Sequence, residues 1–117
     1  MNEQTKTVIE RFDRVFQPHD PSDLANIIAE NCVLENTGPA PDGATYQGYD
    51  ACVEFWQSIA TNKDLNFDTE GIDILGDRGI IRWRLHWGET KEQSVRGVNI
   101  MRVKDGKVVE ALGYVKA

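Results

Sequence analysis

The stretch RGVNIMRVKDGKVVE, residues 96–110, decides the fold class of this chain. Its apolar and polar residues alternate with the period of two that is typical of a β-strand with one buried face. Asp105 and Gly106 interrupt the alternation, and an Asp-Gly pair between two such runs is the strongest short signal for a β-hairpin. The stretch therefore predicts two antiparallel strands, with Asn99 as an amide in a half-buried run.

Two further strand patterns precede this hairpin. LNFDTEGIDIL, residues 65–75, changes its apolar parity after Gly71, which predicts a β-bulge there. IIRWRLHW, residues 80–87, alternates without a break. One predicted face of this second run carries Ile81, Trp83, Leu85 and Trp87, and the other carries Arg82, Arg84 and His86. Consecutive strands joined by short turns predict an antiparallel meander.

The first half of the chain has helical periodicity instead. The expected elements are helices over residues 3–17, 21–28 and 49–60, a brief strand over residues 32–36 and a turn-rich loop over residues 37–48. Helices with one apolar stripe must bury it against another layer. We therefore expect an α+β domain in which three N-terminal helices pack on a strongly curved, mostly antiparallel sheet, with a pocket between the two layers.

Composition argues against several classes of function. The chain has 117 residues, 40% of them hydrophobic, and a net charge of −6, which suits a single domain, residues 1–117, of an acidic protein. Nucleic-acid binders are usually basic, and no apolar run approaches the roughly 18 residues of a membrane helix. The N-terminus lacks a signal-peptide pattern, and the two cysteines lack disulfide-framework spacing. We expect a cytoplasmic protein that binds neither nucleic acid nor membrane.

Two motifs carry a resemblance to a known superfamily. RVKDGKVVE, residues 102–110, resembles the last hairpin of the nuclear transport factor 2-like superfamily, and YQGYDACVEFW, residues 46–56, resembles its entry into the third helix. The resemblance spans nearly the whole chain and is closest to the SnoaL-like and ketosteroid-isomerase-like branches. It implies a conical half-barrel around a mostly apolar pocket.

The resemblance also implies which residues face that pocket. In ketosteroid isomerases one Asp is the general base, and a Tyr and a protonated Asp bind the substrate oxygen. Asn36 stands where the base would be, Asn99 where the protonated Asp would be, and Phe12 where the Tyr would be. Asn99 can donate a hydrogen bond to a carbonyl oxygen, but an amide such as Asn36 is not a useful base, and Phe12 has no donor.

The candidate site residues follow from strand parity and from this resemblance. The candidate catalytic residues are Asn36 and Asn99, and the candidate ligand-binding residues are Phe12, Trp56, Trp83, Leu85, Met101 and Val115. The alternative is that the two amides are structural groups paired with the backbone and that the aromatic residues are core. The two histidines have no cysteine or carboxylate at ligand spacing, so we expect no metal site and no cofactor.

Other carboxylates could replace the missing base. Asp68, Glu70 and Asp73 lie on the strand with the suspected bulge, where parity is ambiguous, and Glu35 has the opposite parity to its neighbour Asn36. An inward carboxylate on this strand would favour an enzyme, and three outward ones would favour a protein that only binds.

These observations support one function hypothesis with two alternatives. The first is a SnoaL-like protein that binds a hydrophobic, carbonyl-bearing small molecule, with isomerisation, cyclisation or hydration as the reactions open to it. The alternatives are a non-catalytic ligand carrier or sensor and a dimerisation module of the same fold.

The face of the sheet opposite the pocket is expected to be an interface. Arg84, His86, Val98 and Ile100 share this face if Trp83 and Asn99 point inward. Family resemblance favours a homodimer packed through this face. Because unpaired buried arginines are costly, we expect the other subunit to supply carboxylate partners for them.

Overall fold

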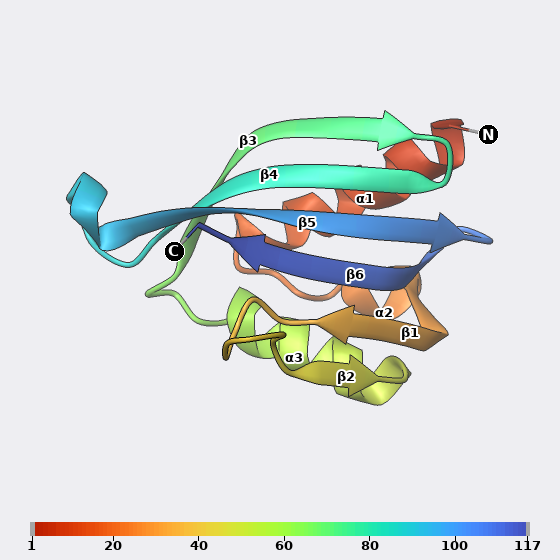
Figure 1. Ribbon diagram of the computed structural model, residues 1–117. Coiled ribbons are helices and arrows are strands. Elements are labelled where there is room, and N and C mark those ends of the chain that lie inside the picture. The colour runs from red at the N-terminus through yellow and green to blue at the C-terminus, as the bar shows by residue number, and fades with distance from the viewer. Residues whose placement is uncertain (1, 117) are drawn as a thin grey trace.

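Figure 1 shows the computed structural model of the chain, which describes residues 2–116, with a sheet on one side and the helices behind it. The elements are α1 (Asn2–Phe16), α2 (Leu24–Ile27), β1 (Ile28–Glu35), β2 (Thr45–Gln47), α3 (Tyr49–Ala60), β3 (Asn66–Leu75), β4 (Arg78–His86), the 3₁₀ helix η1 (Lys91–Gln93), β5 (Ser94–Lys104) and β6 (Lys107–Val115). The six strands form one open sheet in the order β2-β1-β6-β5-β4-β3, with only β1 and β6 parallel. The predicted α+β class and mostly antiparallel sheet are confirmed.

The hairpin between β5 and β6 forms where the sequence predicts it. Lys104 pairs with Lys107, and the two residues between them, Asp105 and Gly106, have φ angles of 53° and 77°. A two-residue turn whose twist matches that of the strands needs positive φ at both positions, which Asp tolerates and Gly adopts without strain. This tight turn sets the β5–β6 register and therefore the face to which Asn99 points.

The predicted bulge in β3 is also present. The register between β3 and β4 shifts between Thr69 and Gly71. A Cβ atom on Gly71 would lie 2.1 Å from Nη2 of Arg82, so the guanidinium group lies directly over this glycine. Before the bulge, Phe67 and Thr69 face the helices, and after it Ile72 does, packed against the core.

Helix α1 closes one end of the space between the layers. Val8, Ile9, Phe12 and Val15 of α1 are buried against the sheet. The helix comes close to β4, because a Cβ on Gly79 would lie 2.4 Å from Cγ1 of Ile9. The core beneath this end is filled, and the space left open lies toward Phe12 and Phe16.

The segment between α1 and α3 differs most from the sequence-based expectation. Helix α2 spans only four residues, and Ile28 begins β1 instead of ending the helix. Strand β1 is longer than the expected 32–36 because it pairs with β6, more than seventy residues further along the chain. Part of the expected loop forms β2, which adds an edge strand to β1.

Candidate functional site

A cavity of about 150 Å³ lies between the sheet and helices α1 and α3. Its lining contains six aromatic side chains, Phe12, Phe16, Phe55, Trp56, Phe67 and Trp83, together with the aliphatic Leu34, Ile59, Leu65, Ile81, Leu85 and Ala111. Thr37, which is exposed, also borders the cavity, so the cavity reaches the protein surface there. An apolar cavity of about this volume in another protein holds benzene, which sets the scale of a ligand.

The aromatic side chains form a connected wall. Phe12 meets Trp56 edge-on with ring centroids 4.9 Å apart, and Phe67 meets Trp83 edge-on at 5.6 Å. Phe16 links the two pairs, at 5.0 Å from Phe12 and 5.8 Å from Phe67. Such edge-to-face contacts are favourable arrangements of aromatic rings, so the shape of the cavity is well determined by its own walls.

Asn99 presents a hydrogen-bond donor to the cavity. The indole Nε1 of Trp83 donates to Oδ1 of Asn99 over 3.3 Å. Because an indole N–H can only donate, this bond fixes which end of the amide faces Trp83. The Asn99 amide nitrogen has no hydrogen-bond partner within residues 2–116, and Asn99 lines the cavity. The N–H groups are therefore free for an oxygen of a ligand.

Gly97 makes this arrangement possible. A Cβ on Gly97 would lie 2.3 Å from the Trp83 ring, so the indole lies directly over the glycine backbone. The two residues are partners in the β4–β5 register, and Asn99 is two residues further along β5 on the same face. The absence of a side chain at Gly97 thus lets Trp83 reach Asn99.

Asn36 lines the cavity as well, but its amide oxygen is used locally. Its Oδ1 accepts a hydrogen bond of 2.8 Å from the backbone N–H of Thr37, and the backbone N–H of Asn36 donates to the backbone oxygen of Ala44. The side-chain oxygen of Asn36 therefore stabilises the turn after β1, which is the structural role that the sequence left open.

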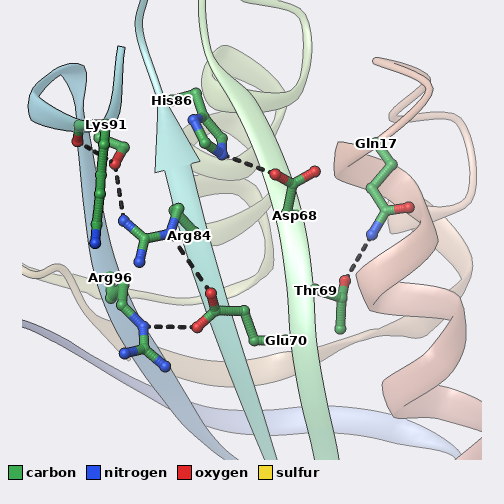
Figure 2. Close-up of polar contacts among 9 residues, drawn as sticks. Gln17, Asp68, Thr69, Glu70, Arg84, His86, Lys91 and Arg96 are labelled. Carbon is green, nitrogen blue, oxygen red and sulfur yellow. Dashed lines mark hydrogen bonds and ion pairs between the residues drawn. The ribbon is translucent and has the colours of Figure 1, made fainter. Parts of the chain in front are cut away.

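Asp13 of α1 is the carboxylate that the sequence analysis missed. Its two oxygens lie 2.8 and 2.7 Å from the hydroxyl of Thr69 on β3, and Asp13 lines the cavity. The Nε2 of Gln17 donates to the same hydroxyl over 2.6 Å, as Figure 2 shows. Because Gln17 occupies Thr69 as an acceptor, the hydroxyl proton is available for Asp13.

Burial raises the pKa of Asp13. The hydrogen bond from Thr69 and the positive charge of Arg14 act in the opposite direction but do not cancel the effect of burial. No ion pair joins Asp13 to a basic side chain of residues 2–116. Groups in a cavity whose pKa is perturbed by burial cluster at functional sites, so Asp13 is a candidate site residue.

A helical pattern could have located Asp13. Ile9, Asp13 and Phe16 are spaced i, i+4 and i+7, so Asp13 lies within the apolar stripe of α1. Gln17 follows Asp13 by four residues and so lies on the same side of the helix. The apolar stripe through Val8, Phe12, Val15 and Phe16 is the stronger periodic signal of this helix, and Asp13 lies beside it.

The structure brings together six of the eight predicted site residues. Phe12, Asn36, Trp56, Trp83, Leu85 and Asn99 all line the cavity. Met101 and Val115 do not, although both lie on the same face of the sheet as Asn99. Met101 is fully buried in the filled core beneath α1, and Val115 is 38% exposed at the far end of β6. Strand parity places a residue on a face but not at a position along it.

The three carboxylates of β3 that could have supplied a base face away from the cavity. Asp68 pairs with His86 at 2.7 Å, and Glu70 pairs with Arg96 at 2.7 Å and Arg84 at 3.5 Å (Figure 2). Asp73 lies 3.8 Å from Arg82. The bond from Arg96 is the main reason that the pKa of Glu70 is lowered.

These pairs correct one expectation about the outer face. The partners of Arg82, Arg84 and Arg96 come from β3 of the same chain, so a second subunit is not needed to supply them. The β3–β4 register explains this, since Asp68 lies opposite Arg84 and the bulge brings Glu70 between Arg84 and Arg96.

No group of three His, Cys, Asp or Glu side chains within residues 2–116 could hold a metal ion. Cys32 and Cys52 are free and buried. Within the same range, no helix combines the length and the apolar character needed to cross a membrane.

A curved sheet with three helices on one face and a cavity between the layers defines a nuclear transport factor 2-like α+β domain. The chain belongs to the SnoaL-like domain family, which it matches over residues 9–111. A comparison with curated protein sequences gives no match.

Solved structures extend this assignment. The chain is 53% identical to an NTF2-like protein of unknown function (mll8193) from Mesorhizobium loti, with a TM-score of 0.92 over 99% of this chain and 93% of that one. A candidate polyketide cyclase from Sinorhizobium meliloti has 18% identity and a TM-score of 0.73 over 92% and 93% of the two chains. A candidate ketosteroid isomerase from Kribbella flavida has 15% identity and a TM-score of 0.79 over 99% and 80%. The last two share the fold alone.

Proposed function

We propose that this protein binds a small, apolar, carbonyl-bearing molecule in the cavity between its sheet and helices. The observation that carries the proposal is the Asn99 amide, whose oxygen is held by Trp83 and whose N–H groups have no partner within residues 2–116, in the lining of a mostly apolar cavity. Sites for small molecules combine an apolar lining with few placed polar groups, and an amide donor without a partner suits a ligand oxygen.

The ligand is the size of a single ring. The cavity volume of about 150 Å³ is comparable to that of a cavity known to hold benzene. The edge-to-face walls around Phe12, Phe67 and Trp83 suit a flat or nearly flat ring. An isomerase-, cyclase- or hydratase-like reaction of such a ligand is the enzymatic form of this proposal.

A carrier or sensor is the second candidate, and one observation favours it. Asp68, Glu70 and Asp73 all point to the outer face, so β3 supplies no base to the cavity. Asn36, which stands at the position of the isomerase base, is not titratable, and its side-chain oxygen is hydrogen-bonded in the turn after β1. The cytoplasmic location predicted from the sequence suits either function.

Two matched ligands test the binding proposal. Cyclohex-2-en-1-one and cyclohexene share one ring and differ in the carbonyl oxygen. We expect Asn99→Leu to weaken binding of the ketone by about 1–3 kcal/mol through loss of a buried hydrogen bond, with little change for the hydrocarbon. Titration followed by nuclear magnetic resonance measures both affinities. Equal losses for the two ligands would show that Asn99 has no polar role.

The outer face of the sheet is proposed as the contact with a second copy of the chain. The strand registers place Val98 beside Tyr114 and Ile100 beside Ile80 and Leu112, which makes an apolar centre. Tyr114 is 51% exposed. Because the surrounding arginines are already paired within the chain, a second copy could cover this centre without burying unpaired charge.

Light scattering tests the homodimer directly. We expect the wild type at micromolar concentration to have twice the 13.2 kDa mass of one chain. Ile100→Asp should weaken the dimer because it places a charge at the apolar centre, whereas Lys63→Asp, on an exposed loop residue, should not. A wild-type mass of one chain would rule out this interface.

A further inference from the structure

We propose that the part of the cavity next to α1 is a subsite for an alkylammonium group, bounded by the carboxylate of Asp13 and the rings of Phe16, Phe67 and Trp83. The ligand of the cavity is then a small ring that carries a positively charged amine. This inference deepens the proposed function and rests on it, because both need the same cavity to take up a small molecule. It does not depend on Asn99, whose amide addresses a different group of the ligand.

The carboxylate of Asp13 has acceptor capacity that the protein does not use. Its two oxygens both lie within 2.8 Å of one hydroxyl group, that of Thr69. The Nε2 of Gln17 donates to the same hydroxyl (Figure 2), so Thr69 has a single proton to give to Asp13. An ionised carboxylate has about four lone-pair sites, so several stay open on a side chain that lines the cavity.

No side chain of the described residues neutralises the charge of Asp13. The ion pairs formed within residues 2–116 do not include it, and its neighbour Arg14 is exposed. Burial disfavours the charged form and raises the pKa of this carboxyl group, although Thr69 and Arg14 act in the opposite direction. A cationic group of a ligand supplies the missing counter-charge, and salt screens such a partly buried pair less than a surface pair.

Aromatic rings border the same part of the cavity. Phe16 follows Asp13 by three residues on α1, so the two side chains are neighbours on one side of the helix. Phe16 reaches Phe67 with 5.8 Å between ring centroids, and Phe67 reaches Trp83 at 5.6 Å. Trp83 pairs across the strands with Thr69, whose hydroxyl touches Asp13. Rings from both the helix and the sheet therefore lie beside the carboxylate.

A carboxylate beside aromatic rings suits an organic ammonium ion. An aromatic ring attracts a cation that lies over its face, within about 6 Å of the centroid, and a carboxylate accepts charge-assisted hydrogen bonds from an ammonium group. A metal ion fits less well, because Mg²⁺ and Ca²⁺ take roughly six or more oxygen ligands, and no group of three His, Cys, Asp or Glu side chains within the described residues could hold one. The cavity volume of about 150 Å³ admits one ring with its amine.

Cyclohexylamine and cyclohexanol test the subsite, because they share one six-membered ring and differ in charge. The amine is protonated at pH 7, since an alkylammonium group such as that of lysine has a pKa of about 10.4. We expect the wild type to bind the amine roughly 10-fold more tightly than the alcohol, through a charge-assisted hydrogen bond and the attraction of the rings. Titration followed by nuclear magnetic resonance measures both affinities.

Asp13→Asn should abolish this preference. The substitution keeps the shape of the side chain and removes its charge, so the amine should lose roughly 10-fold in affinity while cyclohexanol binds as before. Asp68→Asn is the matched control, because it removes one negative charge from the outer face of the sheet. The net charge of the protein changes equally in both variants, but only Asp13→Asn should weaken binding of the amine.

Phe16→Leu separates the contribution of the rings from that of the carboxylate. Leucine keeps an apolar side chain at this position but has no aromatic face. We therefore expect the amine to bind about 2- to 5-fold more weakly, with little change for cyclohexanol. Equal losses for the two compounds would show that Phe16 only fills space and would remove it from the subsite.

The outcomes separate this inference from the binding function. If cyclohex-2-en-1-one binds but the amine has no advantage over the alcohol, the binding function stands and the ammonium subsite is wrong. The subsite is also wrong if the advantage survives in Asp13→Asn, or if Asp68→Asn removes it equally. If the amine binds through Asp13 and the enone does not bind, the subsite stands and the carbonyl part of the proposed function fails. If none of the three compounds binds the wild type, both proposals fail.

Discussion

The two faces of β3 differ in how they treat carboxylates. On the outer face, Asp68, Glu70 and Asp73 each pair with a basic side chain of a neighbouring strand. On the inner face, Asp13 of α1 meets Thr69 and has a hydroxyl as its partner. Thr69 lies between Asp68 and Glu70 in the sequence, so one strand with a period of two serves both faces. The contrast separates a charge-paired surface from a site in which charge is left unpaired.

The unpaired carboxylate of Asp13 lowers the stability of the fold, whereas the paired carboxylates of the outer face raise it slightly. Surface ion pairs are worth up to about 1 kcal/mol each, so the outer face gains modestly from its network. Burial of Asp13 works in the opposite direction, because its charged form loses contact with water. Proteins commonly retain such costs at functional sites.

Among the substitutions on the inner face, Phe12→Ala should cause the largest loss of stability. Phe12 is 1% exposed and contacts both Phe16 and Trp56. Truncation of a buried Phe leaves a cavity and typically costs about 3–5 kcal/mol in the free energy of unfolding. Trp87→Ala, at a residue 49% exposed, is the control and should cost less than about 1 kcal/mol. Urea denaturation measures both, and equal losses would contradict the placement of Phe12 in the wall of the cavity.

Gly97→Ala should destabilise the protein less than Phe12→Ala does. The added methyl group would lie 2.3 Å from the Trp83 ring, so the indole must move and its bond to Asn99 must break. Overpacking of this kind costs about 1–3 kcal/mol. Tryptophan fluorescence and urea denaturation would follow the change. Gly38→Ala, where no atom lies within 4 Å of the added group, should leave the fluorescence as in the wild type.

Asp13→Asn and Glu70→Gln should shift stability in opposite directions at neutral pH. Asp13 has a raised pKa, so between its unfolded value of about 3.9 and its folded value the native state binds more protons, and stability falls as pH rises. Asp13→Asn removes this penalty and should stabilise the protein at pH 7 but not below the unfolded pKa.

The pKa shift of Glu70 has the opposite sign to that of Asp13. Its pKa is lowered, so its contribution is present above the unfolded pKa of about 4.3 and is lost as pH falls through the folded pKa. Glu70→Gln should therefore destabilise the protein at pH 7. Urea denaturation midpoints at pH 7 and pH 3 measure the stability of both variants. If both substitutions shift stability in the same direction at pH 7, the carboxylates of the two faces do not differ in this way.

The smallest expected effect concerns steroids. We expect negligible isomerisation of a 3-oxo-Δ5-steroid, because Asn36 is not a base, Phe12 has no hydroxyl, and a cavity of about 150 Å³ is too small for four fused rings. Absorbance of the conjugated product measures this turnover. Substantial activity of the wild type would show that the cavity opens further than its walls indicate.

Local signals in the sequence predicted most of the sheet and part of the site. The Asp105-Gly106 turn, the parity change at Gly71 and the alternation around Trp83 each depend on neighbouring residues, and the structure confirms them. Helix α3 begins and ends where its periodicity predicts. Asn99 and Trp83 line the cavity for the same reason, since parity on regular strands determines the face.

The remaining features depend on contacts between distant parts of the chain. Strand β1 extends back to Ile28 because β6 pairs with it, and Met101 and Val115 miss the cavity because α1 fills one end of the space and the sheet ends at the other. Asp13 becomes a site residue only when α1 packs over Thr69, 56 positions along the chain. Sequence by itself determined most of the elements and the faces of the long strands, because these follow from local periodicity. Only the tertiary structure decided which charges are paired and which remain in the cavity, because charge pairing and desolvation depend on every element packed nearby.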